Sequence, residues 1–229
     1  MPSVLITGAN RGIGLEFARQ YAAAGWRVEA GCRQPERATD LRRLSERHPE
    51  LRVHALDVVD PASVSALART LASDAIDLLI NNAGVSGPKG QRFGGIDYDG
   101  WLDTLRVNAL GPMRVCEAFV EQVARSERKL IVAITSGMGS IGDSSGGYYA
   151  YRTSKAALNM AMHNVALDLK PRGIIAVVIN PGWVQTDMGT SRATITPEES
   201  ITAMRAIFER LTPDDSGKFL NYRGGTYEW

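Results

Sequence analysis

The stretch of sequence that decides the fold is residues 3–14, which spell SVLITGANRGIG. Its first five residues are mostly apolar, and three glycines follow at Gly8, Gly12 and Gly14. This pattern predicts a buried strand, a tight turn and a helix that continues to Ala24. Glycines at such a turn let the backbone approach a diphosphate, whose charge the amide groups at the helix start attract. The alternative is an ordinary glycine-rich turn without a ligand.

The same alternation of short apolar segments and longer amphipathic segments continues along the chain. Strands are predicted at 3–7, 27–32, 51–56, 76–81, 130–135, 174–180 and 218–220. Helices are predicted at 11–24, 35–47, 61–73, 98–125 (interrupted near Gly111), 148–170 and 197–211. Right-handed crossovers between such strands give an α/β fold, a Rossmann-type doubly wound seven-stranded parallel sheet with helices on both faces. No linker or repeat divides the chain, so we expect a single domain over residues 1–229.

The composition is that of an ordinary globular protein. Hydrophobic residues make up 44% and charged residues 22%, with a formal net charge of +1, so disorder is excluded and no nucleic acid is required as a partner. No apolar run is long enough to span a bilayer, and the N-terminus lacks a signal-peptide pattern. Cys32 and Cys116 lie far apart, and the three histidines are scattered. We therefore expect free thiols, a cytoplasmic location and no metal site.

Two arginines predict which dinucleotide the glycine-rich turn prefers. Residues 31–34 contain no Asp or Glu, the residue types that accept a hydrogen bond from the ribose 2′-hydroxyl of NAD. Arg33 stands there instead, and Arg11 lies in the glycine-rich turn. Two guanidinium groups favour a 2′-phosphate through charge-assisted bonds worth roughly 1.5–3 kcal/mol each, so we expect NADP(H). The alternative is that Arg33 is a solvated surface charge.

Polar and small residues follow three further strands. Asp57, with Val58 beside it, either accepts a hydrogen bond from an adenine or caps the helix that begins at Pro61. The small residues at 82–84 let the backbone lie against a ribose. Pro181 and its neighbouring glycine turn the chain off the sixth strand, so that the following backbone meets the nicotinamide amide.

Tyr151 and Lys155 are four residues apart on a predicted helix, so their side chains share one face. Lowering a phenol pKa from about 10 to neutrality requires about 4 kcal/mol. We expect the Lys155 ammonium and an oxidised nicotinamide ring to supply this together. Tyr148 and Tyr149 have no lysine four residues later. Ser136 follows the fifth strand, so we expect it to meet this pair at the same edge of the sheet.

The loops after the fifth and sixth strands are expected to form the substrate mouth. Trp183 is either a core residue or a pocket wall. The segment 189–196 is short for a lid, which predicts an open pocket for modest hydrophobic carbonyl compounds. The expected pocket residues are Met138, Ser140, Ile141, Tyr148, Trp183 and Met188. The expected cofactor-binding residues are Gly8, Asn10, Arg11, Gly12, Ile13, Gly14, Arg33, Asp57, Val58, Asn82, Ala83, Gly84, Tyr151, Lys155, Pro181, Gly182, Val184 and Thr186.

Together these motifs resemble the short-chain dehydrogenase/reductase family over essentially the whole chain. The matching residues are Thr7–Gly14, Asn81–Gly84, Asn108, Ser136, Tyr151–Lys155 and Pro181–Thr186, in the family's order. Residues 149–159, 181–189 and 221–225 look similar to the sniffer and C-factor branch of the family, which is related to carbonyl reductases that use NADPH.

The resemblance implies a catalytic tetrad of Asn108, Ser136, Tyr151 and Lys155. In it, Tyr151 is the general acid that protonates a carbonyl oxygen as a hydride arrives, and Ser136 holds that oxygen. Lys155 lowers the pKa of Tyr151 and binds the nicotinamide ribose, while Asn108 holds a water molecule. Pro112 has no N–H for the Asn108 carbonyl, which leaves that carbonyl free. The alternative is that Asn108 is a plain helix residue.

The resemblance further implies an NADP(H)-dependent oxidoreductase that interconverts a carbonyl compound and its alcohol, and we expect a carbonyl reductase. The alternative is a C-factor-like signalling or regulatory module that binds NAD(P) with incidental turnover. The expected partners are a small-molecule carbonyl or alcohol substrate and further copies of the chain, in a homodimer or homotetramer, with no membrane. Residues 156–166 either form a two-fold helical interface or face the sheet.

Overall fold

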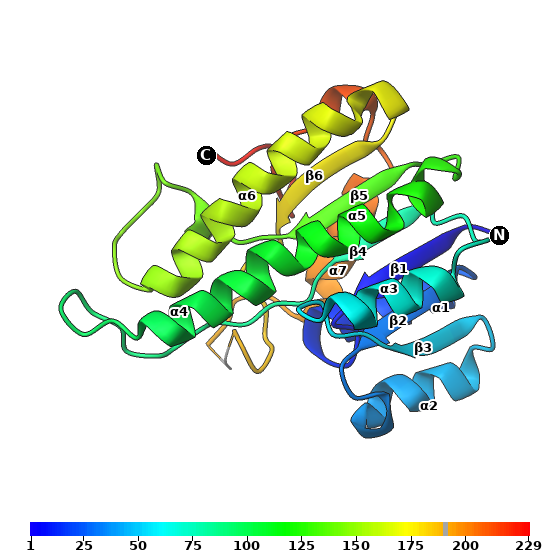
Figure 1. Cartoon of the computed structure of the whole chain (residues 1–229), viewed down its shortest axis with the longest axis horizontal. Helices are drawn as coiled ribbons and strands as arrows, with labels where there is room; N and C mark the ends of the chain where they lie inside the picture. Colours follow the sequence, from blue (N-terminus) through cyan, green and yellow to red (C-terminus); the bar gives the residue numbers. More distant parts are fainter. Residues whose placement is uncertain (190–191) are drawn as a thin grey trace.

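A computed structural model describes residues 1–189 and 192–229 and contains one sheet of seven parallel strands (Figure 1). The strand order is β3-β2-β1-β4-β5-β6-β7. The sheet confirms the predicted doubly wound fold. Its strands are β1 (Ser3–Thr7), β2 (Arg27–Cys32), β3 (Leu51–Ala55), β4 (Leu78–Asn81), β5 (Leu130–Ile134), β6 (Ile175–Asn180) and β7 (Phe219–Asn221).

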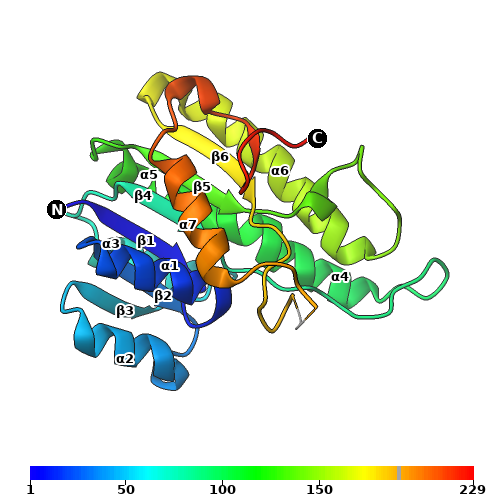
Figure 2. The same ribbon diagram turned by 180° about the vertical axis from the view of Figure 1, so that it is seen from behind.

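Helices cover both faces of the sheet (Figures 1 and 2). Side chains of α1, α2 and α7 pack into the hydrophobic core on one face, and those of α3, α5 and α6 pack into the core on the other. The helices are α1 (Gly12–Ala23), α2 (Thr39–Arg47), α3 (Pro61–Thr70), α4 (Tyr98–Leu105), α5 (Gly111–Ala124), α6 (Tyr149–Leu169) and α7 (Pro197–Phe208).

The sequence explains where these elements form. Every residue of β1, β4, β5 and β6 is buried, because helices cover both faces of a parallel sheet. Asp60 and Pro61 begin α3 as N-cap and first helical residue. Thr196 and Glu199 form a reciprocal capping box at the start of α7.

Two predicted helices differ in detail from the structure. The segment 35–47 is a 3₁₀ turn, Pro35–Arg37, followed by α2, because the backbone at Ala38 leaves the helical region. The long helix 98–125 is interrupted by a π turn at Arg106–Leu110, one turn before the position we predicted. There the Gly111 N–H bonds to the Arg106 carbonyl, five residues earlier.

The strand order reverses direction between β1 and β4, which are neighbours in the sheet although two strands separate them in sequence. In open parallel sheets, ligands bind beyond the carboxyl ends of the strands at such a switch point. The loops after β4, β5 and β6 emerge at this same end of the sheet (Figure 1). No helix in the described ranges is long and apolar enough to cross a bilayer.

Candidate active site

Three of the predicted site residues meet beyond the carboxyl end of β5. Tyr151 and Lys155 lie in the first two turns of α6, with Lys155 Nζ 5.8 Å from the centroid of the Tyr151 ring. Ser136 follows β5, and its hydroxyl group is near enough to that of Tyr151 to lower the pKa of the phenol by hydrogen bonding. Lys155 Nζ donates a hydrogen bond of 2.8 Å to the carbonyl oxygen of Ile134, which fixes the ammonium group at the end of the strand.

Asn108 joins this group from the π turn between α4 and α5. Its side chain is fully buried and exchanges two hydrogen bonds of 2.8 Å with the backbone of Val85, in the loop after β4. The amide also donates to Ser154 Oγ in α6 at 2.9 Å. A methyl group on Gly84 would lie 3.3 Å from Asn108 Oδ1 and 3.7 Å from Lys155 Nζ. Asn108 therefore connects three segments that surround Lys155.

Burial disfavours charge on both titratable groups of the site. It raises the pKa of Tyr151 above its usual value, and the hydrogen bond with Ser136 opposes this only in part. Burial also lowers the pKa of Lys155 to about 8. The expected part of Lys155 in lowering the pKa of Tyr151, together with an oxidised nicotinamide ring, stays a prediction. A phenol with a raised pKa stays protonated at neutral pH, which is the state that a proton donor needs.

The glycine-rich turn presents bare backbone next to the loop after β4. Gly8 has a φ of +67°, and a methyl group on it would lie 2.9 Å from the Cα of Ala83. Asn82 Nδ2 donates to the carbonyl oxygens of Thr7 and Gly8 at 2.9 and 3.1 Å. The helix α1 then begins at Gly12, and its first N–H groups have no partner within the helix. This arrangement fits a diphosphate bound at the start of α1.

The two arginines predicted to bind a 2′-phosphate have different surroundings. Arg11 NH1 forms an ion pair of 2.9 Å with Asp187, from the loop after β6, and both side chains are exposed. A methyl group on Gly12 would lie 3.2 Å from Thr186 Cγ2, so this loop lies against the glycine-rich turn. Arg33 is exposed and makes no hydrogen bond or ion pair with another described residue. Its role as a phosphate ligand or a solvated charge stays a prediction.

Asp57 does not cap α3. Pro61 occupies the first helical turn, so the preceding residue, Asp60, is the N-cap, and its carboxylate accepts from the N–H of Ala62 at 2.9 Å. Asp57 Oδ1 instead accepts from the N–H of Val59 at 3.1 Å, in the loop after β3. The neighbouring Val58 carbonyl accepts a hydrogen bond of 2.8 Å from an arginine of α5, Arg114.

The chain turns sharply where β6 ends. Gly182 has a φ of +83°, and a methyl group there would lie 2.6 Å from Cε1 of Tyr222. Pro181 accepts a hydrogen bond of 2.6 Å from Ser200 Oγ in α7. Val184 then pairs with Ile195 in an isolated bridge. These contacts place the backbone of 181–186 at the carboxyl end of the sheet, as predicted.

Four of the expected pocket residues are large apolar side chains on the surface. Their exposed fractions are 77% for Ile141, 67% for Tyr148, 52% for Trp183 and 48% for Met188. Trp183 is therefore not a core residue, and its Nε1 donates to the Gly189 carbonyl at 2.7 Å. Residues 190 and 191, within the segment that we expected to leave the pocket open, lie outside the described residues.

Ser140 is buried, and its expected place in the pocket lining stays a prediction. Its hydroxyl group donates to the carbonyl oxygen of Trp229 at 3.5 Å and accepts from the N–H of Asp143 at 3.1 Å. The reason is the 3₁₀ turn Gly137–Gly139, which directs the chain toward the last residues of the sequence. Met138, within that turn, is half-buried.

One contact to helix α6 leaves no pattern in the sequence. Tyr148, before α6, has a left-handed backbone with a φ of +48° and provides no side-chain cap. Gln91 takes the place of a capping side chain: its Oε1 accepts a hydrogen bond of 3.2 Å from the N–H of Ala150, in the first turn of α6. The two residues are 59 positions apart, and no local pattern in the sequence marks Gln91 for this role.

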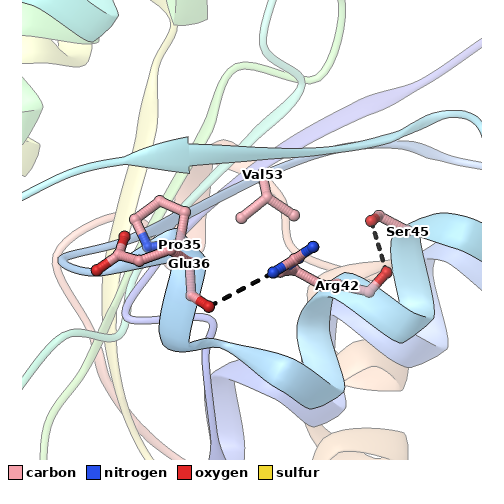
Figure 3. Close-up of a pocket in the computed structure, with 5 residues that line it drawn as sticks. All are labelled: Pro35, Glu36, Arg42, Ser45 and Val53. Atoms are coloured by element: carbon pink, nitrogen blue, oxygen red, sulfur yellow. Dashed lines mark hydrogen bonds between the residues drawn. The ribbon is translucent and has the colours of Figure 1, made fainter.

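A cavity of about 370 Å³ lies at the opposite edge of the sheet (Figure 3). It opens between the 3₁₀ turn after β2, the helix α2 and strand β3. None of the four tetrad residues lines it, so it is separate from the site at β5. Its lining residues are Pro35, Glu36, Arg42, Ser45 and Val53.

Comparison with known proteins agrees with this geometry. Residues 2–195 match the family model described as short chain dehydrogenase. The chain belongs to the short-chain dehydrogenase family. Among curated relatives of this dehydrogenase, the C-signal protein of Myxococcus xanthus is 42% identical over 165 residues, covering 72% of this chain and 99% of the relative.

Two solved structures are similar to this dehydrogenase along its whole length. The carbonyl reductase Sniffer of D. melanogaster superposes with a TM-score of 0.93 at 32% identity, with 100% of both chains covered. The NADPH-bound carbonyl reductase from chicken fatty liver also gives a TM-score of 0.93, at 34% identity, covering 100% of this chain and 99% of the other.

Proposed function

We propose that this short-chain dehydrogenase is an NADP(H)-dependent carbonyl reductase. The observation that carries the proposal is the meeting of Tyr151, Ser136 and Lys155 beyond the carboxyl end of β5. The likeness to carbonyl reductases, one of them bound to NADPH, supports the same reaction class.

Each residue of the site has a separate role in the proposed reduction. Bound NADPH supplies the hydride that adds to the carbonyl carbon. Tyr151, kept protonated by burial, donates its hydroxyl proton to the carbonyl oxygen, so that the product is an alcohol. Ser136 donates a hydrogen bond to the same oxygen and stabilises the negative charge that develops on it. Lys155 holds the nicotinamide ribose and Asn108 fixes the loop beside it.

The residues at the switch point fit the dinucleotide. The bare backbone at Gly8 and the free N–H groups at the start of α1 suit its diphosphate. Arg33, exposed after β2, is the residue that we propose contacts the 2′-phosphate. Asp57 is proposed to contact the adenine with the carboxylate oxygen that does not bond to Val59.

The direct test is NADPH consumption with a panel of ketones, aldehydes and quinones, measured by loss of absorbance of the reduced nicotinamide. We expect turnover with the more hydrophobic members, because the expected mouth carries exposed apolar side chains such as Ile141 and Tyr148. The proposal would be contradicted if no carbonyl compound of the panel increased the rate at which NADPH or NADH is consumed.

The likeness to the C-signal protein favours a second candidate function. In it, the protein is a signalling or regulatory module that binds NAD(P), and turnover is incidental. A pure binding module has no need for a proton donor at Tyr151 next to Ser136. Fluorescence titration that shows tight NADPH binding, together with no turnover on any carbonyl, would favour this second function.

We also propose that the enzyme is a cytoplasmic homo-oligomer. Cys32 and Cys116 are buried and unpaired, which suits a reducing compartment. On α6, Leu158 faces the sheet, whereas Met160 is 63% and Leu167 is 58% exposed. These two apolar residues leave a surface for a two-fold contact. Light scattering after size exclusion should show a dimer or tetramer, and a monomer at micromolar concentration would refute the contact.

A further inference from the structure

We propose that the residues after β7, the tail 222–229, are a positioning element that holds Ser136 in its catalytic orientation. This inference rests on the proposed function of Ser136. The tail acts on the 3₁₀ turn Gly137–Gly139, which follows Ser136 directly and is called the serine turn below.

The tail folds back along the last strand. A turn at Gly225 is closed by a hydrogen bond of 3.1 Å from the N–H of Asn221 to the Gly225 carbonyl. Thr226 then forms an antiparallel bridge with Leu220, and the N–H of Tyr227 donates to the Phe219 carbonyl at 2.7 Å. Figure 2 shows this tail, in red, on the side of the molecule where α6 lies.

Aromatic contacts anchor the end of the tail. The Tyr227 ring stacks on Phe219 with centroids 5.0 Å apart. The Trp229 ring lies 5.5 Å from Phe219 and meets His163 of α6 edge-on at 5.6 Å. The tail is therefore held by both β7 and α6, although most of its backbone lies at the surface.

The anchored tail contacts the serine turn and the residues after it. A methyl group on Gly137 would lie 2.9 Å from the hydroxyl oxygen of Tyr227, so the two are packed with no space between them. The Trp229 carbonyl accepts from the N–H of Gly142 at 3.1 Å and from Ser140 Oγ at 3.5 Å.

The opposite side of the serine turn rests on the catalytic helix α6. A methyl group on Gly139 would lie 2.9 Å from Cβ of Lys155. Asn159 Nδ2 donates to the Gly139 carbonyl at 3.3 Å, and Arg152 NH1 donates to the Met138 carbonyl at 3.4 Å. The serine turn is thus enclosed between α6 and the tail, and removing the tail contacts frees one of its two sides.

The orientation of the catalytic serine depends on this turn. Ser136 Oγ accepts a hydrogen bond of 3.2 Å from the N–H of Met138, which uses one lone pair of the oxygen and leaves its hydroxyl proton free to donate elsewhere. If the turn moves, Met138 no longer fixes the Ser136 hydroxyl group. A misplacement of about 1 Å in such a group lowers rates by roughly 100-fold.

The test compares Tyr227→Ala with Tyr227→Phe, which keeps the stacking on Phe219. We expect Tyr227→Ala to lower kcat by roughly 10- to 100-fold with little change in NADPH Kd, because the Tyr227 side chain packs on Phe219 and Gly137 and not on an expected cofactor-binding residue. Tyr227→Phe should retain most of the wild-type kcat. Arg223→Ala is the matched control, since among the described residues the side chain of this exposed residue bonds with Tyr222 and not with the serine turn, and the substitution should leave kcat unchanged. Equal kcat in Tyr227→Ala and the wild type would overturn the proposal.

A second readout does not depend on turnover. Amide hydrogen exchange of Ser140 and Gly142 should become faster in Tyr227→Ala and in Trp229→Ala, while amides of β1 keep their protection. Unchanged exchange at both positions in two folded variants would overturn the proposal. If the wild-type protein reduces no carbonyl compound, the proposed function fails, but the exchange experiment still decides whether the tail holds the turn.

Gly137→Ala tests the contact between Gly137 and Tyr227 by changing the glycine instead of the tyrosine. The added methyl group meets the Tyr227 ring, so the substitution should lower kcat in the wild-type background and have a smaller effect in the Tyr227→Ala background. Strictly additive effects would mean that Gly137 and Tyr227 act independently, which contradicts the proposal.

Discussion

At the scale of single residues, Lys155 shows how function and stability oppose each other in this protein. Its ammonium group is buried and donates to the Ile134 carbonyl, and no carboxylate of the described residues forms an ion pair with it. Burial lowers the pKa of Lys155 from 10.5 to about 8. Below pH 8 the folded protein therefore carries a charged group that is more stable in the unfolded chain.

Replacing this group should stabilise the fold. Lys155→Met should raise the free energy of unfolding by about 2–3 kcal/mol below pH 8, because each pKa unit corresponds to about 1.4 kcal/mol and one hydrogen bond is lost. In the wild type, the destabilisation caused by the buried charge of Lys155 decreases as the pH rises from 8 to 10.5. In this range the amine has lost its proton in the folded protein but not in the unfolded chain. Urea denaturation of both proteins across pH 6–11 measures the difference, and a constant difference would contradict the assigned burial.

Arg33 decides the cofactor preference in our account. Arg33→Asp should weaken NADPH binding by about 10- to over 100-fold, from the loss of charge-assisted bonds worth roughly 1.5–3 kcal/mol, and should strengthen NADH binding. Arg43→Asp is a matched control, because Arg43 is an exposed residue of α2 paired with Asp40. Equal affinity of the natural protein for NADPH and NADH would show that our interpretation of Arg33 is wrong.

At the scale of elements, β2 and β3 are joined by a buried carboxylate that the sequence alone did not mark. Glu29 is fully buried in β2, and His54 Nε2 lies 2.6 Å from its Oε2. Arg27 and Arg52 lie 3.5 and 3.7 Å from its Oε1, which makes no hydrogen bond with a described residue. This carboxylate lies within β2, between Arg27, Arg52 and His54, and not after the end of the strand, where an acid would accept from a ribose.

Removing Glu29 takes the carboxylate partner from Arg52 and His54, whereas Arg27 keeps its ion pair of 3.0 Å with Asp74. Glu29→Ala should therefore destabilise the protein by about 1–3 kcal/mol. Asp103→Ala, which removes an exposed partner of Arg106, should have little effect. Thermal unfolding followed by circular dichroism compares the two, and similar melting temperatures would contradict the role of Glu29.

The elements also show what could be predicted from the sequence. Strands such as β5 were predicted within a residue or two because burial on both faces requires a continuous apolar run. Strand ends and the four-residue spacing predict that Ser136, Tyr151 and Lys155 lie together, whereas the tetrad with Asn108 is implied by the family resemblance. Contacts between distant segments, such as Gln91 at the start of α6 and Tyr227 against Gly137, leave no periodic pattern and were not predicted.

At the scale of the whole molecule, we propose that residues 1–229 form one domain. The two hydrophobic cores lie on opposite faces of one continuous sheet, and alternate residues of strands such as β1 and β5 enter each core. Neither core keeps its shape if the other unfolds. Urea unfolding should therefore give coincident transitions by tryptophan fluorescence and circular dichroism, whereas two separated transitions would contradict the single domain.

In the proposed reaction, the Tyr151 hydroxyl group delivers the proton while the nicotinamide delivers the hydride. The most direct measurement is a single-turnover reaction with NADPH deuterated at the transferring position of C4, for the wild type and Tyr151→Phe. We predict deuterium on the carbinol carbon of the product, and a loss of about 100- to 10,000-fold in rate for the variant with unchanged NADPH Kd. A Tyr151→Phe protein that transfers deuterium at the wild-type rate would contradict the account.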